Sequence, residues 1–571
     1  MTYQVITGTL KARTAVHVGS GAGSDLTDAL LRRNTAGQLI IPGTTIAGAL
    51  RTLVTRLAPR LKLKNNKVCA ALTGSDDSCD CAVCHLFGDI NPSDAEDAES
   101  EASRILVFNA RLKGDAPQPF IRDGVGINRT TGAAARAGGV KFDVEVLPAD
   151  TEFGLRLELR DVDEDENDKL LLAAVLTEWE AGRVWLGGNV ARGLGGFKLD
   201  DVAYKTLALD TADNLLTFLK EDKPWQEAQR ESNWLQSQME SVQTTAPPDQ
   251  VLPVARRWVA ITGTLQAQGP LLTNDATISG QTGFDHAPLL AQLDDWAHPV
   301  LAGSGLRGVL RSHAERIART LATHNADSKT AFLHTCPACS PVESHADKPL
   351  ASCDTLLKDV EFPTDKEVSD KHLCLACRLF GSTRRGSRLL VEDAPYQPTE
   401  AQLKPVLKMM DFLAIDRFTG GGAEGAKFDA LALWKPAFNL RLHLENPELW
   451  ELGWLALVLR DLQEGWLTVG FGAAKGFGQV ELENLQCTLG YLSLEDVQDL
   501  GLEAREKREK EKAVYTEMLF SLEQAQPWVE KFLEEVRELR RGNDRLPNLK
   551  ADSYFGQEPD LPELYPSEVT L

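Results

Sequence analysis

The sequence predicts an α+β protein built from two tandem ferredoxin-like domains that carry long insertions. The chain has 571 residues, which is more than one ordinary hydrophobic core accommodates. A series of motifs occurs twice in the same order, and within each copy strand patterns alternate with helix patterns. Strand–helix–strand followed by strand–helix–strand is the succession of elements that a ferredoxin-like core requires.

Five segments of the first half recur in the second half. The pairs are 6–12 with 261–267, 42–51 with 302–311, 81–88 with 374–381, 127–143 with 415–429, and 193–197 with 476–480. Five matches in one order indicate the duplication of a whole domain. We therefore predict a first repeat over residues 1–204, an interdomain linker over 205–255, a second repeat over 256–488, and a C-terminal helix with an extended tail over 489–571.

The first half of one repeat reads as a strand followed by a helix. Residues 3–13 alternate apolar and polar side chains, as a half-buried strand does. Residues 46–58 have a helical pattern, and Thr44 or Thr45 can cap this helix. The backbone amides at the start of such a helix form a potential anion site.

The second half of the repeat continues with the same kinds of element. Residues 151–159 alternate again and predict a strand, and residues 169–181 predict a helix. A glycine-rich turn over 187–196 then leads into a final strand. The insertions between these elements contain the cysteines and a segment rich in glycine, alanine and arginine.

Charge and hydropathy restrict the class of protein. The net charge of -22 argues against nucleic-acid binding over the whole surface, although it does not exclude a local basic groove. The sequence has no run of eighteen apolar residues and no signal-peptide layout at its start, so we expect a cytoplasmic protein that does not enter a membrane.

The chain has ten cysteines, and most of them fall into two groups, which predicts metal sites rather than disulfides. The first group is Cys69, Cys79, Cys81 and Cys84. In the second group, two Cys-x-x-Cys pairs make Cys336, Cys339, Cys374 and Cys377 the preferred ligands, with Cys353 as an alternative. Four thiolates fit tetrahedral zinc and leave no open position, so we predict two structural zinc sites.

Several of these motifs together resemble one known family. Segments 17–21 and 40–51, the Cys-x-x-Cys-x-Leu-Phe-Gly motif, the Ile-Asn/Asp-Arg-x-Thr-Gly motif and the glycine-rich turns at Gly193 and Gly476 resemble the CRISPR backbone RAMP (repeat-associated mysterious protein) family. The resemblance covers most of residues 1–488. A fusion of two such units resembles the double-backbone subunit of type III-D variant complexes.

The resemblance implies a role in a type III CRISPR ribonucleoprotein of antiviral defence. Each unit would have an RRM-like core stacked along the guide CRISPR RNA. Each would also extend a β-hairpin thumb that interrupts the duplex between the guide and the complementary target RNA. The expected partners are these two RNAs and other CRISPR effector subunits. In several type III members an aspartate of the early loop cleaves the target RNA.

Two kinds of segment are candidates for RNA binding. Helix entries offer backbone amides and guanidinium groups to a phosphate, and glycine-rich segments offer cations on a flexible backbone. In the first repeat the candidates are Gly43, Thr44, Thr45, Arg51, Asn128, Arg129, Arg136 and Lys141. In the second repeat they are Gly303, Ser304, Arg307, Arg311, Arg417 and Lys427.

The candidate catalytic residues are aspartates of the loop that precedes the helix entry. A carboxylate can position the 2′-hydroxyl of the substrate, accept its proton, or hold Mg²⁺ or another divalent metal ion. Asp28 occupies the position of the family's cleaving aspartate, and Asp25 is the second choice. The longer loop of the second repeat offers Asp285. No recurring carboxylate triad is evident in the sequence, so a site made by metal ions alone is not indicated.

Three other functions remain open. The chain can be a scaffold that binds guide and target without chemistry, in which case the aspartates are ordinary loop acids. It can be a stand-alone endonuclease that processes precursor guides, although such an enzyme does not need two thumbs. It can also be a zinc-stabilised protein-interaction module, for which the net charge of -22 is the best support.

Overall fold

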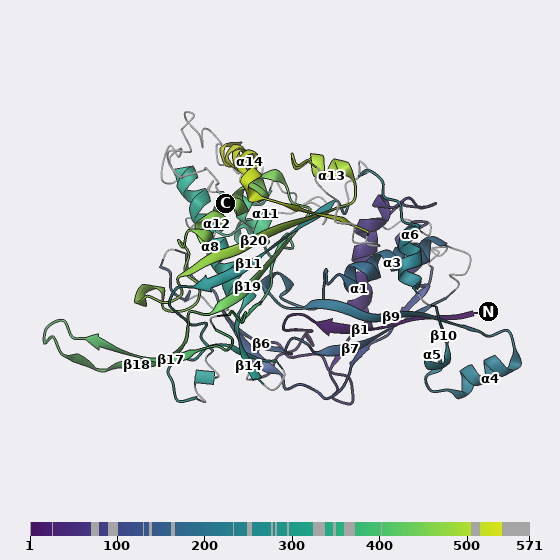
Figure 1. The fold of residues 1–571 in the computed structure, drawn as a ribbon, viewed down its shortest axis with the longest axis horizontal. Coiled ribbons are helices and arrows are strands. Elements are labelled where there is room, and N and C mark those ends of the chain that lie inside the picture. Colours follow the sequence, from purple (N-terminus) through teal and green to yellow (C-terminus); the bar gives the residue numbers. More distant parts are fainter. Residues whose placement is uncertain are drawn as a thin grey trace.

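The computed structural model describes residues 2–25, 27–69, 79–89, 101–129, 131–135, 140–160, 166–231, 233–247, 254–275, 278–279, 282–293, 296–323, 337–345, 350–358, 372–400, 402–503 and 514–538. Two large antiparallel sheets lie next to each other, each with helices packed on one face, and a long hairpin extends from one end of the molecule (Figure 1). Within these residues no helix is long and apolar enough to cross a membrane.

The first sheet has eight strands in the order β10-β9-β1-β7-β4-β2, with β3 beside β7 and β8 beside β9. The strands are β1 (Thr2–Ala12), β2 (Ile40–Ile41), β3 (Ile105–Val107), β4 (Ala110–Leu112), β7 (Glu152–Leu159), β8 (Val184–Trp185), β9 (Gly196–Ala208) and β10 (Gln229–Glu231). Strand β1 lies between β9 and β7, and Ile6, Leu10 and Ala12 on one of its faces are fully buried in the core.

Helices α1 (Gly43–Leu57), α2 (Ala82–Phe87) and α3 (Glu166–Glu180) belong to the same half of the chain. Helix α1 buries Ile46, Leu50 and Val54, which recur every four residues and therefore lie on one face. The strands predicted at 3–13 and 151–159 and the helices predicted at 46–58 and 169–181 are all present.

The second sheet has the strand order β15-β19-β11-β20-β21. Its strands are β11 (Arg257–Ala267), β15 (Leu389–Val391), β19 (Ala437–Glu445), β20 (Val480–Tyr491) and β21 (Thr516–Phe520). Its helices are α8 (Gly303–Thr323), α10 (Cys353–Leu356), α11 (Leu375–Phe380) and α12 (Leu449–Gln463). The central strands of both sheets carry the same irregularity, between Thr7 and Thr9 in β1 and between Thr262 and Thr264 in β11. The duplication therefore extends to the details of strand register.

Each half of the chain also forms a separate hairpin. The first consists of β5 (Phe120–Val125) and β6 (Lys141–Val146), and the second of β17 (Leu407–Ile415) and β18 (Gly422–Trp434). The second hairpin protrudes far from the body (Figure 1), and Phe418 at its tip is 99% exposed. A short strand, β12 (Pro270–Leu271), pairs with β18 of the second hairpin. A separate small sheet consists of β13 (Leu290–Leu293), β14 (Trp296–Leu301) and β16 (Ala394–Pro395).

The segment predicted as a linker is folded over much of its length. Strand β9 continues to Ala208, and α4 (Ala212–Lys220), α5 (Pro224–Glu227), β10 and α6 (Trp234–Glu240) follow it. The polar composition of 205–255 concealed these short elements, because each buries only a few side chains, such as Trp234 and Met239 of α6. Residues 232 and 248–253 of the predicted linker lie outside the described residues.

The C-terminal part adds structure to the second sheet. Strand β20 passes the predicted boundary at 488, and after α13 (Leu494–Gln498) strand β21 pairs with it. Helix α14 (Gln526–Glu538) packs on α12, where the rings of Trp454 and Phe532 stack at 5.1 Å. Most of the predicted charged helix and all of the predicted tail lie outside the described residues.

Candidate functional site

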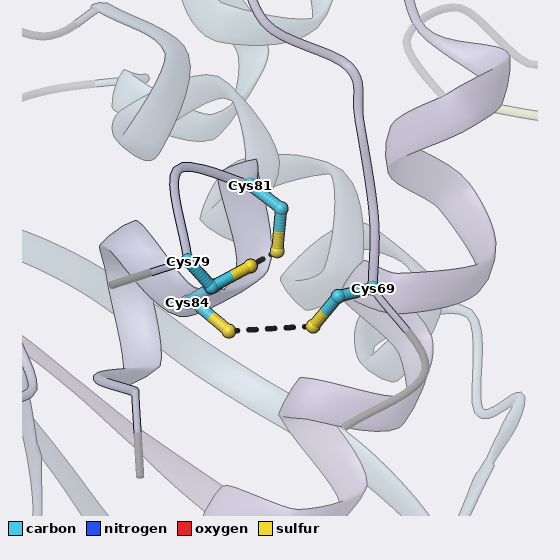
Figure 2. A group of neighbouring side chains, drawn as sticks. All are labelled: Cys69, Cys79, Cys81 and Cys84. Carbon is cyan, nitrogen blue, oxygen red and sulfur yellow. Dashed lines mark hydrogen bonds between the residues drawn. The ribbon is translucent and has the colours of Figure 1, made fainter. Parts of the chain in front are cut away.

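Four cysteines of the first repeat surround one point (Figure 2). Cys69 follows the end of α1, Cys79 and Cys81 precede α2, and Cys84 lies in its first turn. The four Sγ atoms lie within 4.8 Å of one another, and those of Cys69 and Cys84 are 3.5 Å apart. Zinc–sulfur bonds of about 2.3 Å in a tetrahedron place sulfurs about 3.8 Å apart, so these thiols fit a zinc ion.

A second quartet lies in the second repeat and consists of Cys339, Cys353, Cys374 and Cys377, all buried. The Sγ atom of Cys353 lies 3.6 Å from that of Cys339 and 3.4 Å from that of Cys374. Cys353, the alternative ligand of the sequence analysis, therefore completes this group. Cys336, one of the preferred ligands, lies outside the described residues.

The surroundings of the two quartets are equivalent. In each, the first cysteine of the Cys-x-x-Cys motif caps a short helix: the Sγ atoms of Cys81 and Cys374 each accept a backbone hydrogen bond at 3.4 Å, from Cys84 and Cys377 respectively. An arginine of the preceding long helix also points at each quartet. Arg51 Nη2 lies 3.4 Å from the sulfur of Cys84, and Arg311 Nη2 lies 3.7 Å from that of Cys377. Such donors stabilise thiolates, so each donor set and its outer contacts fit a structural zinc site.

The predicted catalytic aspartates occupy equivalent positions beside the second strand of each hairpin. Asp28 Oδ2 accepts a hydrogen bond of 2.9 Å from the backbone N–H of Asp143, and Asp285 Oδ2 accepts one of 2.9 Å from the N–H of Asp429. The next residue in each loop, Ala29 or His286, forms a parallel bridge to the same hairpin strand. Asp28 and Asp285 are exposed, so RNA can reach both carboxylates. Asp25, the second choice, is also exposed in the first loop.

Two further aspartates accompany each of these residues, a recurrence that the sequence analysis did not find. Asp123 lies directly opposite Asp143 in the first hairpin, and Asp411 lies opposite Asp429 in the second. Asp123 and Asp143 are 20 residues apart in the sequence, and Asp411 and Asp429 are 18 apart. The sequence analysis missed both pairs because only the register of each hairpin brings them together. Among the described residues, only the cysteine quartets bring ligand atoms from three or more His, Cys, Asp or Glu residues within 4.8 Å of one another.

The Asp123 carboxyl of the first hairpin has a raised pKa. Burial, followed by the neighbouring Asp143 carboxylate, raises the pKa of Asp123 from 3.8 to about 6. The folded protein therefore binds this proton more tightly than the unfolded chain, and the free energy of unfolding falls as the pH rises from about 4 to about 6.

We expect Asp123→Asn to raise the melting temperature by a few degrees at pH 8 and to leave it unchanged below pH 4. Melting curves at both pH values test this, with the exposed Asp115→Asn as control; a gain at low pH would contradict it.

The predicted helix entries are present, and their first amides are engaged. Gly43 N–H donates to Asn109 Oδ1, and Gly303 N–H donates to Asp393 Oδ1, each at 2.8 Å. A Cβ atom at Gly43 would lie 2.3 Å from the backbone oxygen of Val107, so only glycine fits. Beside these glycines, Thr44 and Ser304 are exposed and Thr45 is half-buried.

The structure engages several of the predicted RNA-binding arginines inside the protein. Arg129 Nε donates to Glu315 at 2.9 Å, and Arg311 Nε donates to the same buried carboxylate at 2.8 Å. Arg307 donates to the backbone oxygen of Phe380. Together with Arg51, which faces Cys84, these side chains have partners that the sequence did not reveal. Asn128 accepts a hydrogen bond from Thr131 N–H in the first hairpin loop.

The predicted cations of the hairpins remain at the surface. Lys141 and Lys427 have side chains that are 65% and 68% exposed, and Lys427 pairs with Asp411 at 3.3 Å. Arg417 is exposed beside the tip of the second hairpin. Arg136 lies outside the described residues.

Arg192, Arg307 and Arg311 form a basic cluster between the repeats. The sequence analysis did not single out Arg192. Arg192 lies in the glycine-rich turn of the first repeat, and this turn contacts α8 of the second. Burial, Arg311 and Arg192 together lower the pKa of Arg307 from 12.5 to about 9. Its Nε atom is buried without a hydrogen-bond partner in the described part of the chain. The positive charge at this point is therefore incompletely balanced, which favours the binding of an anion.

Comparison with known proteins identifies the family. The model of the RAMP superfamily matches residues 9–198 and 264–481. The chain is also similar to the CRISPR system Cms endoribonuclease Csm3 of Methanocaldococcus jannaschii, with 26% identity over 213 residues, which is 35% of this chain and 79% of that protein. The family matches fall within the two predicted repeats and cover more than half of the chain. The resemblance found in the motifs is thus confirmed, and the chain belongs to the RAMP superfamily, with two family regions in one polypeptide.

Proposed function

We propose that this protein is a double backbone subunit of a type III CRISPR ribonucleoprotein, which binds guide RNA and cleaves complementary target RNA at two sites. The similarity to Csm3, named as an endoribonuclease, supports the type of complex and the reaction. The observation that carries the proposal is the equivalence of Asp28 and Asp285. Both exposed carboxylates are held beside a hairpin by a backbone N–H of the equivalent residue in its second strand.

The fold proposed for each repeat is ferredoxin-like. In the second half, the order β15-β19-β11-β20 places the first strand in the sequence between the third and the fourth, with α8 after the first and α12 after the third. The order β4-β7-β1-β9 repeats this in the first half, with α1 and α3 in the equivalent places. Antiparallel strands crossed over by two helices have the connectivity of this fold. The protruding hairpin β17–β18 would be a thumb of the resembled family.

The proposed chemistry is attack of the substrate's own 2′-hydroxyl on the adjacent phosphorus. Asp28 or Asp285 would accept or orient the hydroxyl proton, and the leaving 5′-oxygen would take a proton from water. A divalent ion would neutralise charge on the phosphate. Mg²⁺ commonly takes one or two carboxylates together with substrate phosphate oxygens, and no three carboxylates of the described residues bring an oxygen each within 4.8 Å of the others. The RNA would therefore have to supply further ligands.

Guide binding is proposed at the basic cluster of Arg192 and Arg307. A phosphate there would receive charge-assisted hydrogen bonds and would balance the excess positive charge. We expect Arg307→Gln to weaken guide RNA binding about 10-fold to 100-fold, since a hydrogen bond to a charged group is worth about 1.5–3 kcal/mol. The slope of log affinity against log salt should also decrease by about one.

Filter binding or fluorescence anisotropy over a series of salt concentrations measures both quantities. Lys531→Gln, on the exposed side of α14, is the matched control and should leave the affinity and the slope unchanged. A separate melting curve shows that the Arg307 variant is folded. Unchanged affinity and slope would contradict the proposed phosphate site. Weak, salt-insensitive binding by the wild-type protein would favour a protein-interaction module instead.

A further inference from the structure

The outer face of the second sheet, opposite its helices, is the surface on which the first repeat packs. Arg13 of the first repeat donates to both carboxylate oxygens of Glu392, at 3.0 and 2.8 Å. Trp185 donates to Glu392 at 3.2 Å, and its ring lies 4.8 Å from that of His443 on β19. Two homologous units are therefore joined by a head-to-tail contact between different surfaces. Such a contact leaves one surface of each kind available at the two ends.

The corresponding face of the first sheet can be located by strand register. Gly8 pairs with Leu155 as Gly263 pairs with Leu440, so Arg156 corresponds to Arg441. By the same alignment, Tyr3 corresponds to Trp258. Asn109 and Asp393 each accept the hydrogen bond of a helix-entry glycine, so the residues before them, Phe108 and Glu392, also correspond.

The interdomain segment covers this face of the first sheet. The Arg156 guanidinium lies between two rings, 3.6 Å from the centroid of Phe108 and 4.0 Å from that of Trp225 on α5. The ring of Tyr3 packs against that of Phe218 on α4 at 4.9 Å. Val5 faces the same side as Tyr3 and is fully buried. Helices α4 and α5 therefore occupy, on the first sheet, the place that the first repeat occupies on the second.

The part of the second repeat that contacts the first, which includes Glu315 of α8, differs in its charged residues from the corresponding part of the first repeat. On the second repeat, Glu392, Asp393 and Glu315 bind Arg13, Arg122 and Arg129 of the first repeat at 2.8 to 3.1 Å. On the first repeat, the alignment places Phe108, Asn109 and Thr55 at these positions. The covered face is therefore less acidic and more apolar than the one that forms the junction.

The second repeat has an edge that corresponds to the edge by which the first repeat contacts it, and this edge has fewer cations. Glycines 182, 187, 193 and 195 share positive φ angles with glycines 465, 470, 476 and 478, which fixes the alignment of the two turns. Gln268 and Met410 stand where the first repeat has Arg13 and Arg122, and Trp466, in the place of Arg183, is 70% exposed. Arg417 and Lys475 stand in the places of Arg129 and Arg192, so this edge retains two cations, while Gln268, Met410 and Trp466 make the rest of it uncharged. A second copy of this chain could thus place this largely uncharged, partly apolar edge on the face around Phe108.

We propose that residues 212–231 form a cap that prevents the chain from stacking on copies of itself. Helix α4 of the cap and the second hairpin, β17–β18, lie at opposite ends of the molecule (Figure 1). Without the cap, each copy would offer one free surface of each kind, and the head-to-tail contact would extend into open chains of copies. With the cap, only the edge of the second repeat is available to a neighbour.

The experiment uses the RNA-free full chain, so it does not depend on the proposed function. Phe218→Ala with Trp225→Ala removes both rings that hold the cap. Sedimentation velocity should show the wild type as a monomer at all concentrations and the double variant as oligomers that grow with concentration. Leu219→Ala, on the exposed side of α4, is the matched control and should stay monomeric. Adding Trp466→Glu to the double variant should restore the monomer.

The result that would overturn the proposal is a double variant that remains monomeric, or a wild type that already associates. Oligomers that persist with Trp466→Glu would also overturn it, because they would use another surface. Circular dichroism and the zinc content show whether the double variant is folded. If it is not, Trp225→Ala alone takes its place, and hydrogen exchange of residues 212–231 provides the second readout. Exchange of this segment in the wild type as fast as in an unfolded peptide would mean that the face is not capped.

Discussion

The assembled ribonucleoprotein that carries Asp28→Ala is expected to lose one product of target-RNA cleavage while the other products remain. In our account Asp28 orients or deprotonates the attacking 2′-hydroxyl at one hairpin, and Asp285 does so independently at the other. Loss of a general base typically reduces the rate about 100-fold to 10,000-fold, so one product should disappear within a normal time course. Denaturing gels of an end-labelled, guide-complementary RNA, with and without Mg²⁺, measure this.

The controls separate chemistry from structure. Asp28 also accepts a hydrogen bond from the N–H of Asp143, so alanine could displace the hairpin. Asp28→Asn retains an acceptor oxygen but cannot take a proton, and it should be as inactive as the alanine variant. If asparagine restores cleavage, the role of Asp28 is structural. If Asp25→Ala removes the product instead, the catalytic assignment passes to Asp25.

Loss of a zinc site is expected to have the largest effect on stability. We expect two zinc ions per wild-type chain and one in Cys374→Ser, because a tetrahedral site with three thiolates binds zinc much more weakly. Zinc binding contributes about 10–16 kcal/mol in small zinc-dependent domains, so part of the second repeat should unfold and the melting temperature should fall by more than about 10 °C. Elemental analysis and melting curves measure both changes.

Cys487→Ala is the matched control, since Cys487 is buried in β20 far from either quartet in sequence, and it should retain both ions. The same assay identifies the fourth ligand of the second site. The structure places Cys353 with Cys339, Cys374 and Cys377, so Cys353→Ser should lose one ion and Cys336→Ser should retain both. A wild-type protein without zinc, or a Cys374 variant with two ions, would contradict this account.

The repeat and the first cysteine quartet were predictable because they depend on residue order and short spacing. Cys69, Cys79, Cys81 and Cys84 lie within sixteen residues, so chain connectivity alone brings them together. The second quartet spans 39 residues, and spacing could not decide between Cys336 and Cys353. There the preference for two Cys-x-x-Cys pairs failed to include a cysteine that the structure places in the group.

The sequence was least informative where strand register or interdomain packing decides a residue's environment. Asp123 and Asp143 become neighbours only because β5 and β6 pair in one register. Arg129 and Arg311 look like free cations in the sequence, yet both bind the buried carboxylate of Glu315. The short helices α4 and α5 have little core of their own. They pack against Tyr3 and Arg156 of the first sheet, which are distant from them in the sequence.

The most direct test of the central claim is target cleavage by the complex with both Asp28→Asn and Asp285→Asn. We predict that this complex binds guide and target RNA with wild-type affinity and makes none of the backbone-dependent products, while each single variant lacks a different one. If the double variant still makes every product, neither aspartate is catalytic. The protein would then be a scaffold on which another subunit cuts.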